Sequence, residues 1–278
     1  MTPTPYKLEK RSQEKIESPL LTFARNVSSQ CGEDGVIERI FQIIPEAAGY
    51  FVEFGAWDGH HLSNCWNLAI HHGWEGCFIE ADKARFSDLR VNHGSNSRVR
   101  CVNALVQAEG PQSLDSILVS LGAPRAFGLL SIDIDGMDYF VWEGLRAFRP
   151  SVVVIEFNPT VPNDVLFVQA KDSRVNQGCS LLALVDLAKV KGYELACCTA
   201  FNAFFVCAEL YPRLGILDNS ISRLYRPLMD GRIFHGYDSS IYVAGMPGLV
   251  WANIALTSDD FQVLPKSRRI FHDGKSAG

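Results

Sequence analysis

The most informative features of this 278-residue sequence are those it lacks. No apolar run approaches the roughly 18 residues that a membrane-spanning helix requires, and the first residues lack the apolar segment of a signal peptide. None of the eight cysteines forms a CxxC pair, so we expect buried free thiols and a cytoplasmic protein. With a net charge of −5, broad binding to nucleic acid or to an anionic membrane is disfavoured.

Short apolar segments alternate with segments of helical periodicity along the middle of the chain. The expected strands are residues 50–54, 77–80, 99–102, 129–133, 152–157, 193–199 and 204–208. The expected helices are residues 63–72, 83–92, 112–120, 138–147 and 180–191. Before the first strand, apolar residues repeat at helical spacing from Val36 to Ile44, in a helix that Ser28 or Ser29 can cap and Pro45 closes. Strands that are apolar on both faces and alternate with helices indicate an α/β fold with a parallel sheet covered on both sides. The last two strands are close enough to form a hairpin, which places one antiparallel strand in this sheet.

The two ends of the chain are less regular than the middle. Residues 1–27 are polar and contain Pro3, Pro5 and Pro19, which is typical of a loosely docked N-terminal arm. Residues 28–208 carry the alternating pattern and form the expected domain. We expect residues 209–278 to be a C-terminal extension that packs on this domain without a core of its own.

A glycine-containing segment follows the first expected strand. It runs from Glu53 to Gly59, and its glycines, Gly55 and Gly59, allow a tight turn and close approach of the backbone to a ligand. Ligands of open α/β sheets bind beyond the carboxyl ends of the strands, where Glu53 would repel a diphosphate but suits an amino group. Glu80 ends the second strand and can accept both hydroxyls of a ribose. This combination favours S-adenosylmethionine over NAD, and Asn103 after the third strand is either an adenine contact or a turn residue.

Four motifs occur in order within residues 28–208. They are Ser29-Gln-Cys-Gly-Glu-Asp-Gly, Glu53-Phe-Gly-Ala-Trp-Asp-Gly, Ser131-Ile-Asp-Ile-Asp-Gly-Met-Asp and Val154-Ile-Glu-Phe-Asn. Together they resemble the FkbM-type class I methyltransferases. The resemblance implies a Rossmann-like, seven-stranded, mostly parallel sheet with helices on both faces. It also implies S-adenosylmethionine as cofactor and methyl transfer to a hydroxyl of a sugar, glycolipid or natural product. The commoner family form ends the fourth strand with Asp-x-Glu-Gly, whereas this sequence has Asp-x-Asp-Gly.

Acidic residues gather at the ends of the fourth and fifth expected strands. Asp133 and Asp135 are two residues apart, Asp138 begins the next helix, and Glu156 and Asn158 end the neighbouring strand. Crowded carboxylates repel one another, and Mg²⁺ or another divalent cation would relieve this repulsion by binding their oxygens. Asp133, Asp135, Glu156 and Asn158 are therefore candidate metal ligands. Two alternatives need no metal: Asp138 caps its helix, and Asp133 binds the cofactor or loop amides.

Proton removal from the acceptor has two candidate routes. Asp133 and Asp135 can orient the acceptor directly or through a metal ion. His61, which follows the glycine segment, is a candidate general base, although a solvated loop histidine needs no such role. These routes compete, because a metal-bound hydroxyl needs no strong protein base.

The pattern as a whole predicts an S-adenosylmethionine-dependent O-methyltransferase that acts on a small molecule or saccharide, with no nucleic-acid or membrane partner. The sequence leaves the oligomeric state open. One alternative is a binding module of the same fold that does not turn over substrate. Another is a metal-dependent phosphatase with Asp133 as nucleophile, although Met137 replaces the threonine expected there and the motif follows three other strands.

Overall fold

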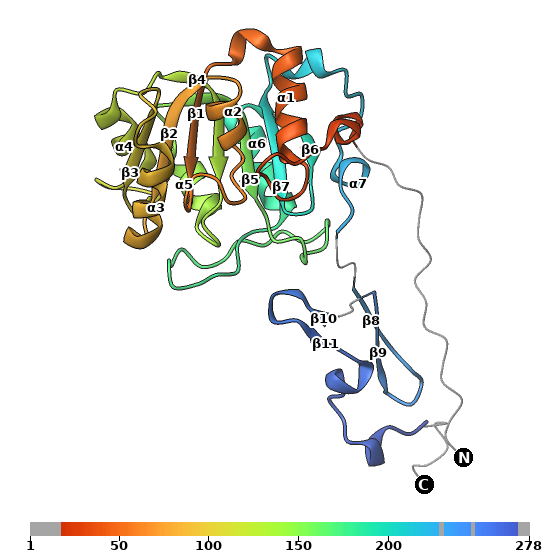
Figure 1. Cartoon of the computed structure of the whole chain (residues 1–278). Coiled ribbons are helices and arrows are strands. Elements are labelled where there is room, and N and C mark those ends of the chain that lie inside the picture. Colours follow the sequence, from red (N-terminus) through yellow and green to blue (C-terminus); the bar gives the residue numbers. More distant parts are fainter. Residues whose placement is uncertain (1–17, 228–230, 246–247, 272–278) are drawn as a thin grey trace. The chain divides into compact units, whose positions relative to one another are not determined.

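Seven strands form one sheet in a computed structural model that describes residues 18–227, 231–245 and 248–271 (Figure 1). The strands are β1 (Tyr50–Phe54), β2 (Glu75–Glu80), β3 (Val99–Asn103), β4 (Ala126–Ile132), β5 (Arg149–Glu156), β6 (Tyr193–Cys198) and β7 (Asn202–Cys207). Their order is β3-β2-β1-β4-β5-β7-β6. All neighbours are parallel except β7, which is antiparallel to both β5 and β6. The Rossmann-like, seven-stranded, mostly parallel sheet is confirmed, including its one antiparallel strand.

Helices cover both faces of this sheet (Figure 1). The α-helices are α1 (Glu33–Ile43), α2 (Trp66–Ile70), α3 (Lys83–His93), α4 (Leu114–Leu121), α5 (Asp138–Gly144), α6 (Leu181–Lys191) and α7 (Ile221–Leu224). Short 3₁₀-helices are η1 (Pro19–Phe23), η2 (Pro45–Ala47), η3 (Tyr211–Leu214), η4 (Val250–Ala252), η5 (Ser258–Phe261) and η6 (Lys266–Arg268). One core joins the sheet to α1, α2 and α3, and the other joins it to α4, α5 and α6.

The helices α2 and α5 are shorter than their sequence patterns predict. In each case a side chain accepts hydrogen bonds from backbone N–H groups next to the helix. The segment before α2 is held as a turn, since the Ser63 hydroxyl accepts hydrogen bonds from the backbone N–H groups of Cys65 and Trp66. After α5, the backbone N–H groups of Arg146 and Ala147 donate to the Asp115 carboxylate. Both changes stop a helix that hydrophobic periodicity alone would extend.

The described chain divides into two compact units, with the larger one formed by residues 18–159 and 163–226. Part of the predicted N-terminal arm belongs to this unit, because Leu20 is buried and the Ser18 hydroxyl donates to the Ala196 carbonyl. The rest of the arm, residues 1–17, lies outside the described residues. The larger unit also extends beyond the predicted limit at residue 208 and includes α7, whose Leu224 is buried in the core.

Among the described residues, the smaller unit contains 160–162, 227, 231–245 and 248–271. It has two antiparallel pairs, β8 (Arg232–His235) with β9 (Ile241–Ala244) and β10 (Gly248–Leu249) with β11 (Ile254–Ala255). Among its described residues from 231 onward, none is buried. That the extension lacks a core of its own and that it packs on the domain both stay predictions.

None of the helices in the described part of the chain is both long and apolar enough to cross a membrane.

Candidate active site

The turn after β1 brings two backbone segments into close contact. Gly55 has a φ of +73°, and a Cβ atom placed on it would lie 1.6 Å from the Asp133 carbonyl oxygen. Gly59 has a φ of +69°, and a Cβ atom there would lie 2.5 Å from Leu89 of α3 and 2.7 Å from His93. The two glycines are therefore required by the packing of the turn between the end of β4 and α3.

Glu53 lies in β1 and is buried beneath this turn. Its carboxylate accepts hydrogen bonds from the Ser63 hydroxyl at 2.6 Å and from the Asn64 backbone N–H at 2.9 Å. Burial raises the pKa of Glu53 to about 7, and the hydrogen bonds from Ser63 and Asn64 oppose this increase. Through these hydrogen bonds, Glu53 stabilises the loop at residues 63–65. Its predicted contact with a cofactor amino group stays a prediction.

Glu80, at the end of β2, connects the glycine turn to the segment that leads into α3. Its carboxylate accepts hydrogen bonds from the backbone N–H groups of Trp57 at 2.8 Å and Asp82 at 2.7 Å. Each carboxylate oxygen has two lone pairs, so both retain acceptor capacity for the hydroxyls of a ribose. The guanidinium of Arg85 stacks 4.0 Å above the Trp57 ring, which is half exposed beside this position.

Asn103 ends β3 next to Glu80. Its side-chain amide donates to the Glu80 carbonyl at 2.8 Å and to the Ala81 carbonyl at 3.1 Å. These bonds fasten β3 to β2 and give Asn103 a turn-stabilising role, which was one of the two alternatives. The predicted cofactor residues therefore do meet at the carboxyl ends of β1, β2 and β3, as the topology requires.

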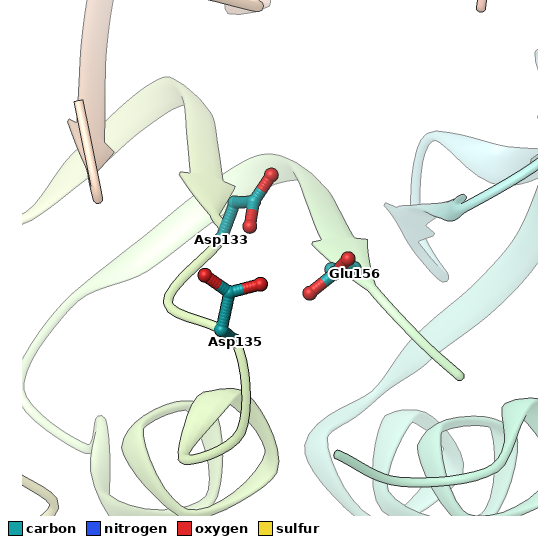
Figure 2. Close-up of side chains that lie close together, drawn as sticks. All are labelled: Asp133, Asp135 and Glu156. Atoms are coloured by element: carbon teal, nitrogen blue, oxygen red, sulfur yellow. The ribbon is translucent and has the colours of Figure 1, made fainter. Parts of the chain in front are cut away.

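Asp133, Asp135 and Glu156 form an acidic cluster at the ends of β4 and β5 (Figure 2). One carboxylate oxygen from each lies within 4.8 Å of the others, and solvent reaches all three side chains. Desolvation raises the pKa of Asp133, and the charges of Asp138 and Asp135 raise it further. Desolvation and the charge of Asp133 likewise raise the pKa of Glu156 to about 9. The cluster therefore resists full ionisation and attracts protons or cations.

Asp138 shapes the backbone that carries this cluster. Its buried carboxylate accepts hydrogen bonds from the backbone N–H groups of Ile134 at 2.9 Å and Gly136 at 2.8 Å. Between them, Asp135 has a φ of +56°, a left-handed conformation that is uncommon for a non-glycine residue. Asp138 stands in the first turn of α5 but does not cap it, because the helix begins after Met137 without a side-chain cap and the Asp138 carboxylate binds the loop before it; the predicted capping role is therefore wrong.

The structure shows other contacts for two further predicted site residues, His61 and Asn158. His61 is exposed, its backbone N–H donates to Asp58 at 2.7 Å, and its ring centroid is 6.3 Å from that of Trp57. No hydrogen bond among the described residues joins the His61 ring to the acidic cluster. The amide of Asn158 donates to the Gln177 carbonyl at 3.0 Å, which ties it to the long segment between β5 and α6. The roles of His61 as a base and Asn158 as a ligand stay predictions.

A second buried group, which the sequence pattern had not indicated, stands beside the cluster. Glu33, the first residue of α1, accepts hydrogen bonds from the Thr199 hydroxyl at 2.6 Å and the Asn202 amide at 3.4 Å. Asn202 pairs directly with Glu156 in the β5–β7 ladder, and the charge of Glu33 contributes to the raised pKa of Asp133. The motif from Ser29 to Gly35 contained the signal for Glu33, but only tertiary pairing brings Asn202 there.

No protein-family profile and no curated protein matches this sequence. Among solved structures, the chain is similar to the CurJ carbon methyltransferase, with 11% identity, a TM-score of 0.41 and coverage of 63% of this chain and 52% of that one. It is similar to the O-methyltransferase NcsB1 from neocarzinostatin biosynthesis, with 14% identity, a TM-score of 0.37 and coverage of 58% and 50%. A third is a putative caffeoyl-CoA O-methyltransferase from Staphylococcus aureus, with 12% identity, a TM-score of 0.39 and coverage of 62% and 82%. The aligned part of this chain spans about half the length of the first two.

Similarities at this level assign neither an activity nor a substrate. The sheet itself, with its order β3-β2-β1-β4-β5-β7-β6 and one antiparallel strand, has the Rossmann-like fold of the class I methyltransferases.

Proposed function

We propose that this protein is an FkbM-type methyltransferase that transfers the methyl group of S-adenosylmethionine to a hydroxyl of a small molecule or saccharide. The observation that supports this proposal best is the arrangement around Glu80. Its carboxylate holds the Trp57 backbone within the glycine turn and keeps acceptor capacity at the end of β2. This is where the ribose of a nucleoside cofactor lies in doubly wound folds.

The acidic cluster lies on the next two strands from this turn, β4 and β5, where an acceptor can approach the methyl group. The methyl group is already activated by the sulfonium, so the chain needs to align donor and acceptor and to take up one proton. In the proposed step, the acceptor oxygen bonds to the methyl carbon, the sulfur–carbon bond breaks, and the hydroxyl proton passes to a carboxylate. Asp133 and Asp135 are the proposed groups for orienting this hydroxyl, with His61 as the alternative base.

The test is titration calorimetry of S-adenosylmethionine with the wild type and the Glu80→Ala variant. We expect this change to weaken binding tenfold or more, because a lost ribose contact to a carboxylate costs about 1–3 kcal/mol. Glu75→Ala is the matched control: it removes an exposed glutamate from the opposite end of the same strand and should leave the affinity unchanged. Folded wild-type protein that binds no S-adenosylmethionine would refute the proposal.

Activity requires a second experiment. S-adenosylmethionine with a ¹³C-labelled methyl group would be incubated with a panel of sugars and phenols, and products would be examined by NMR. A new O-methyl signal that Asp135→Asn abolishes would support hydroxyl methylation. Tight cofactor binding without any transfer across the panel would favour the alternative of a binding module.

A further inference from the structure

The acidic cluster of Asp133, Asp135 and Glu156 has the spacing of ligands to one ion. Their oxygens lie within 4.8 Å of one another (Figure 2). Two oxygens bound to the same cation at about 2.1–2.5 Å can be no more than roughly 4–5 Å apart, so small side-chain rotations suffice to bring all three into contact with one ion. An all-oxygen, anionic donor set suits Mg²⁺, Mn²⁺ and Ca²⁺.

Carboxylates alone can crowd together without a ligand, but Asn202 provides an independent observation. It is 5% exposed, and its amide oxygen has no hydrogen-bond partner among the described residues. Glu33 determines the orientation of this amide, because the amide nitrogen of Asn202 donates to the Glu33 carboxyl oxygen and therefore faces it. The oxygen is consequently directed away from Glu33. A buried amide oxygen that lacks a donor is costly, and a ligand at this position would satisfy it.

The sheet places Asn202 beside the cluster. It is paired directly with Glu156 in the antiparallel β5–β7 ladder, so the two side chains project to the same face with Cβ atoms about 5 Å apart. Val154 and Phe204, two residues away on each strand, are buried in the core beneath α1, which identifies the face. This is also the face from which Glu33, at the start of α1, reaches Asn202.

The described part of the chain supplies no cationic partner to the cluster. Among the described residues, no lysine, arginine or histidine forms an ion pair with Asp133, Asp135 or Glu156. Glu33 adds a further negative charge close by. The field in this region therefore favours a small cation, which would bind the carboxylates and the unpartnered amide together.

We propose that Asp133, Asp135, Glu156 and Asn202 form a binding site for one divalent cation of the Mg²⁺, Mn²⁺ or Ca²⁺ class. Asn202 then replaces Asn158, the ligand expected from the sequence, whose amide donates to the segment between β5 and α6. Cation binding does not depend on the proposed methyl transfer, although a cation here would lie where it can bind and acidify the acceptor hydroxyl.

The experiment is a titration of the full chain with Mn²⁺, in the absence of S-adenosylmethionine, followed by electron paramagnetic resonance of the free ion. We expect one ion per chain and an affinity that falls tenfold or more in Asp135→Asn, an exposed position where the change should not impair folding. Glu143→Gln, an exposed glutamate in α5, is the control and should bind like the wild type. No binding at millimolar Mn²⁺, or equal binding by Asp135→Asn and the control, overturns the proposal.

A separate pair of variants tests Asn202 as the fourth ligand. Asn202→Ala should weaken Mn²⁺ binding, whereas Asn158→Ala should not, with thermal melting used to confirm that each variant is folded. The reverse result would overturn the assignment of Asn202. If the protein binds Mn²⁺ but not S-adenosylmethionine, the methyltransferase proposal is refuted and the cation site is supported. If it binds S-adenosylmethionine but not Mn²⁺, the cation site is refuted and the methyltransferase proposal is unaffected.

Discussion

Two groups of acidic residues at the carboxyl ends of the strands differ in their hydrogen bonding. Glu53, Glu80 and Asp138 have carboxylates that accept hydrogen bonds from backbone N–H groups of the loops around them. The acidic cluster has no such donors among the described residues and contains carboxylates that repel one another. The first group, which we call the loop-holding acids, fixes the loops at this end of the sheet, and Glu80 within it keeps acceptor capacity for a ribose. The acidic cluster instead has its carboxylates free of hydrogen bonds from the described residues. Sites for binding commonly reduce stability in this way, because their groups are arranged for a ligand and not for the fold.

The largest effect should come from disturbing the turn that separates the two groups. Gly55→Ala places a methyl group against the Asp133 carbonyl and requires an unfavourable φ, so we expect a loss of roughly 4 kcal/mol of stability from overpacking and strain combined. Urea unfolding measures this loss. The control is Gly122→Ala, which shares the left-handed φ but has no atom within 4 Å of the added methyl group. It should lose only about 1 kcal/mol, and equal losses would contradict the close contact.

The pH dependence of stability tests the loop-holding acids. The pKa of Glu53 is raised from 4.5 to about 7, so the folded protein holds this proton more tightly than the unfolded chain does. The resulting stabilisation is complete below pH 4.5 and is lost as the pH rises through about 7, with a total change of about 3 kcal/mol. Glu53→Gln cannot ionise and should show a flatter profile between about pH 5 and pH 8. Parallel profiles for the two proteins, measured by urea unfolding, would disprove the assignment.

Asp138→Asn tests how much the hydrogen bonds of Asp138 to the loop before α5 contribute to stability. The amide has one acceptor oxygen in place of two, so the backbone N–H of Ile134 or Gly136 loses its partner. Leaving a buried donor unpaired costs about 2 kcal/mol, which thermal or urea unfolding would detect. Asp186→Asn, an exposed position on α6, serves as the control and should change stability little. An Asp138→Asn protein as stable as this control would show that the loop holds its shape by other means.

The smallest change is expected in the acidic cluster, and with the opposite sign. The pKa of Glu156 is raised to about 9, so its contribution to stability is present below its ordinary value of 4.5 and is lost as the pH rises through 9. Glu156→Gln removes this ionisation and the repulsion of Asp133. Because solvent reaches the Glu156 side chain and screens its charge, we expect unfolding at about pH 8 to cost only about 1 kcal/mol more in the variant than in the wild type. A marked destabilisation would mean that Glu156 helps hold the fold as Glu53 does.

The sequence predicted most elements of the larger unit well, because hydrophobic periodicity directly reports which residues are buried. The strand at Tyr50–Phe54 matches its expected range, and α3 and α6 differ from theirs by about one residue at an end. The misses at α2 and α5 arose where Ser63 and Asp115 capture backbone N–H groups. Such local competition between a side chain and helix hydrogen bonds does not alter the apolar pattern.

The sequence predicted the positions of the candidate site residues better than their hydrogen-bond partners. The chain order of strands and the rule that ligands lie at their carboxyl ends were enough to bring Glu80 beside the glycine turn and Asp133 beside Glu156. The same reasoning could not show that both oxygens of Glu53 accept hydrogen bonds from Ser63 and Asn64, since these contacts depend on how the loop folds back.

By itself, the sequence determined the α/β architecture, the glycine turn and the acids at the strand ends, because each depends on local spacing and burial pattern. Tertiary structure alone decided which acids are held and which are left facing one another. It also decided that Asn202, 46 residues after Glu156, stands directly opposite it. Strand pairing across the sheet sets that neighbourhood, and pairing depends on the packing of both cores and not on any pattern within a single segment.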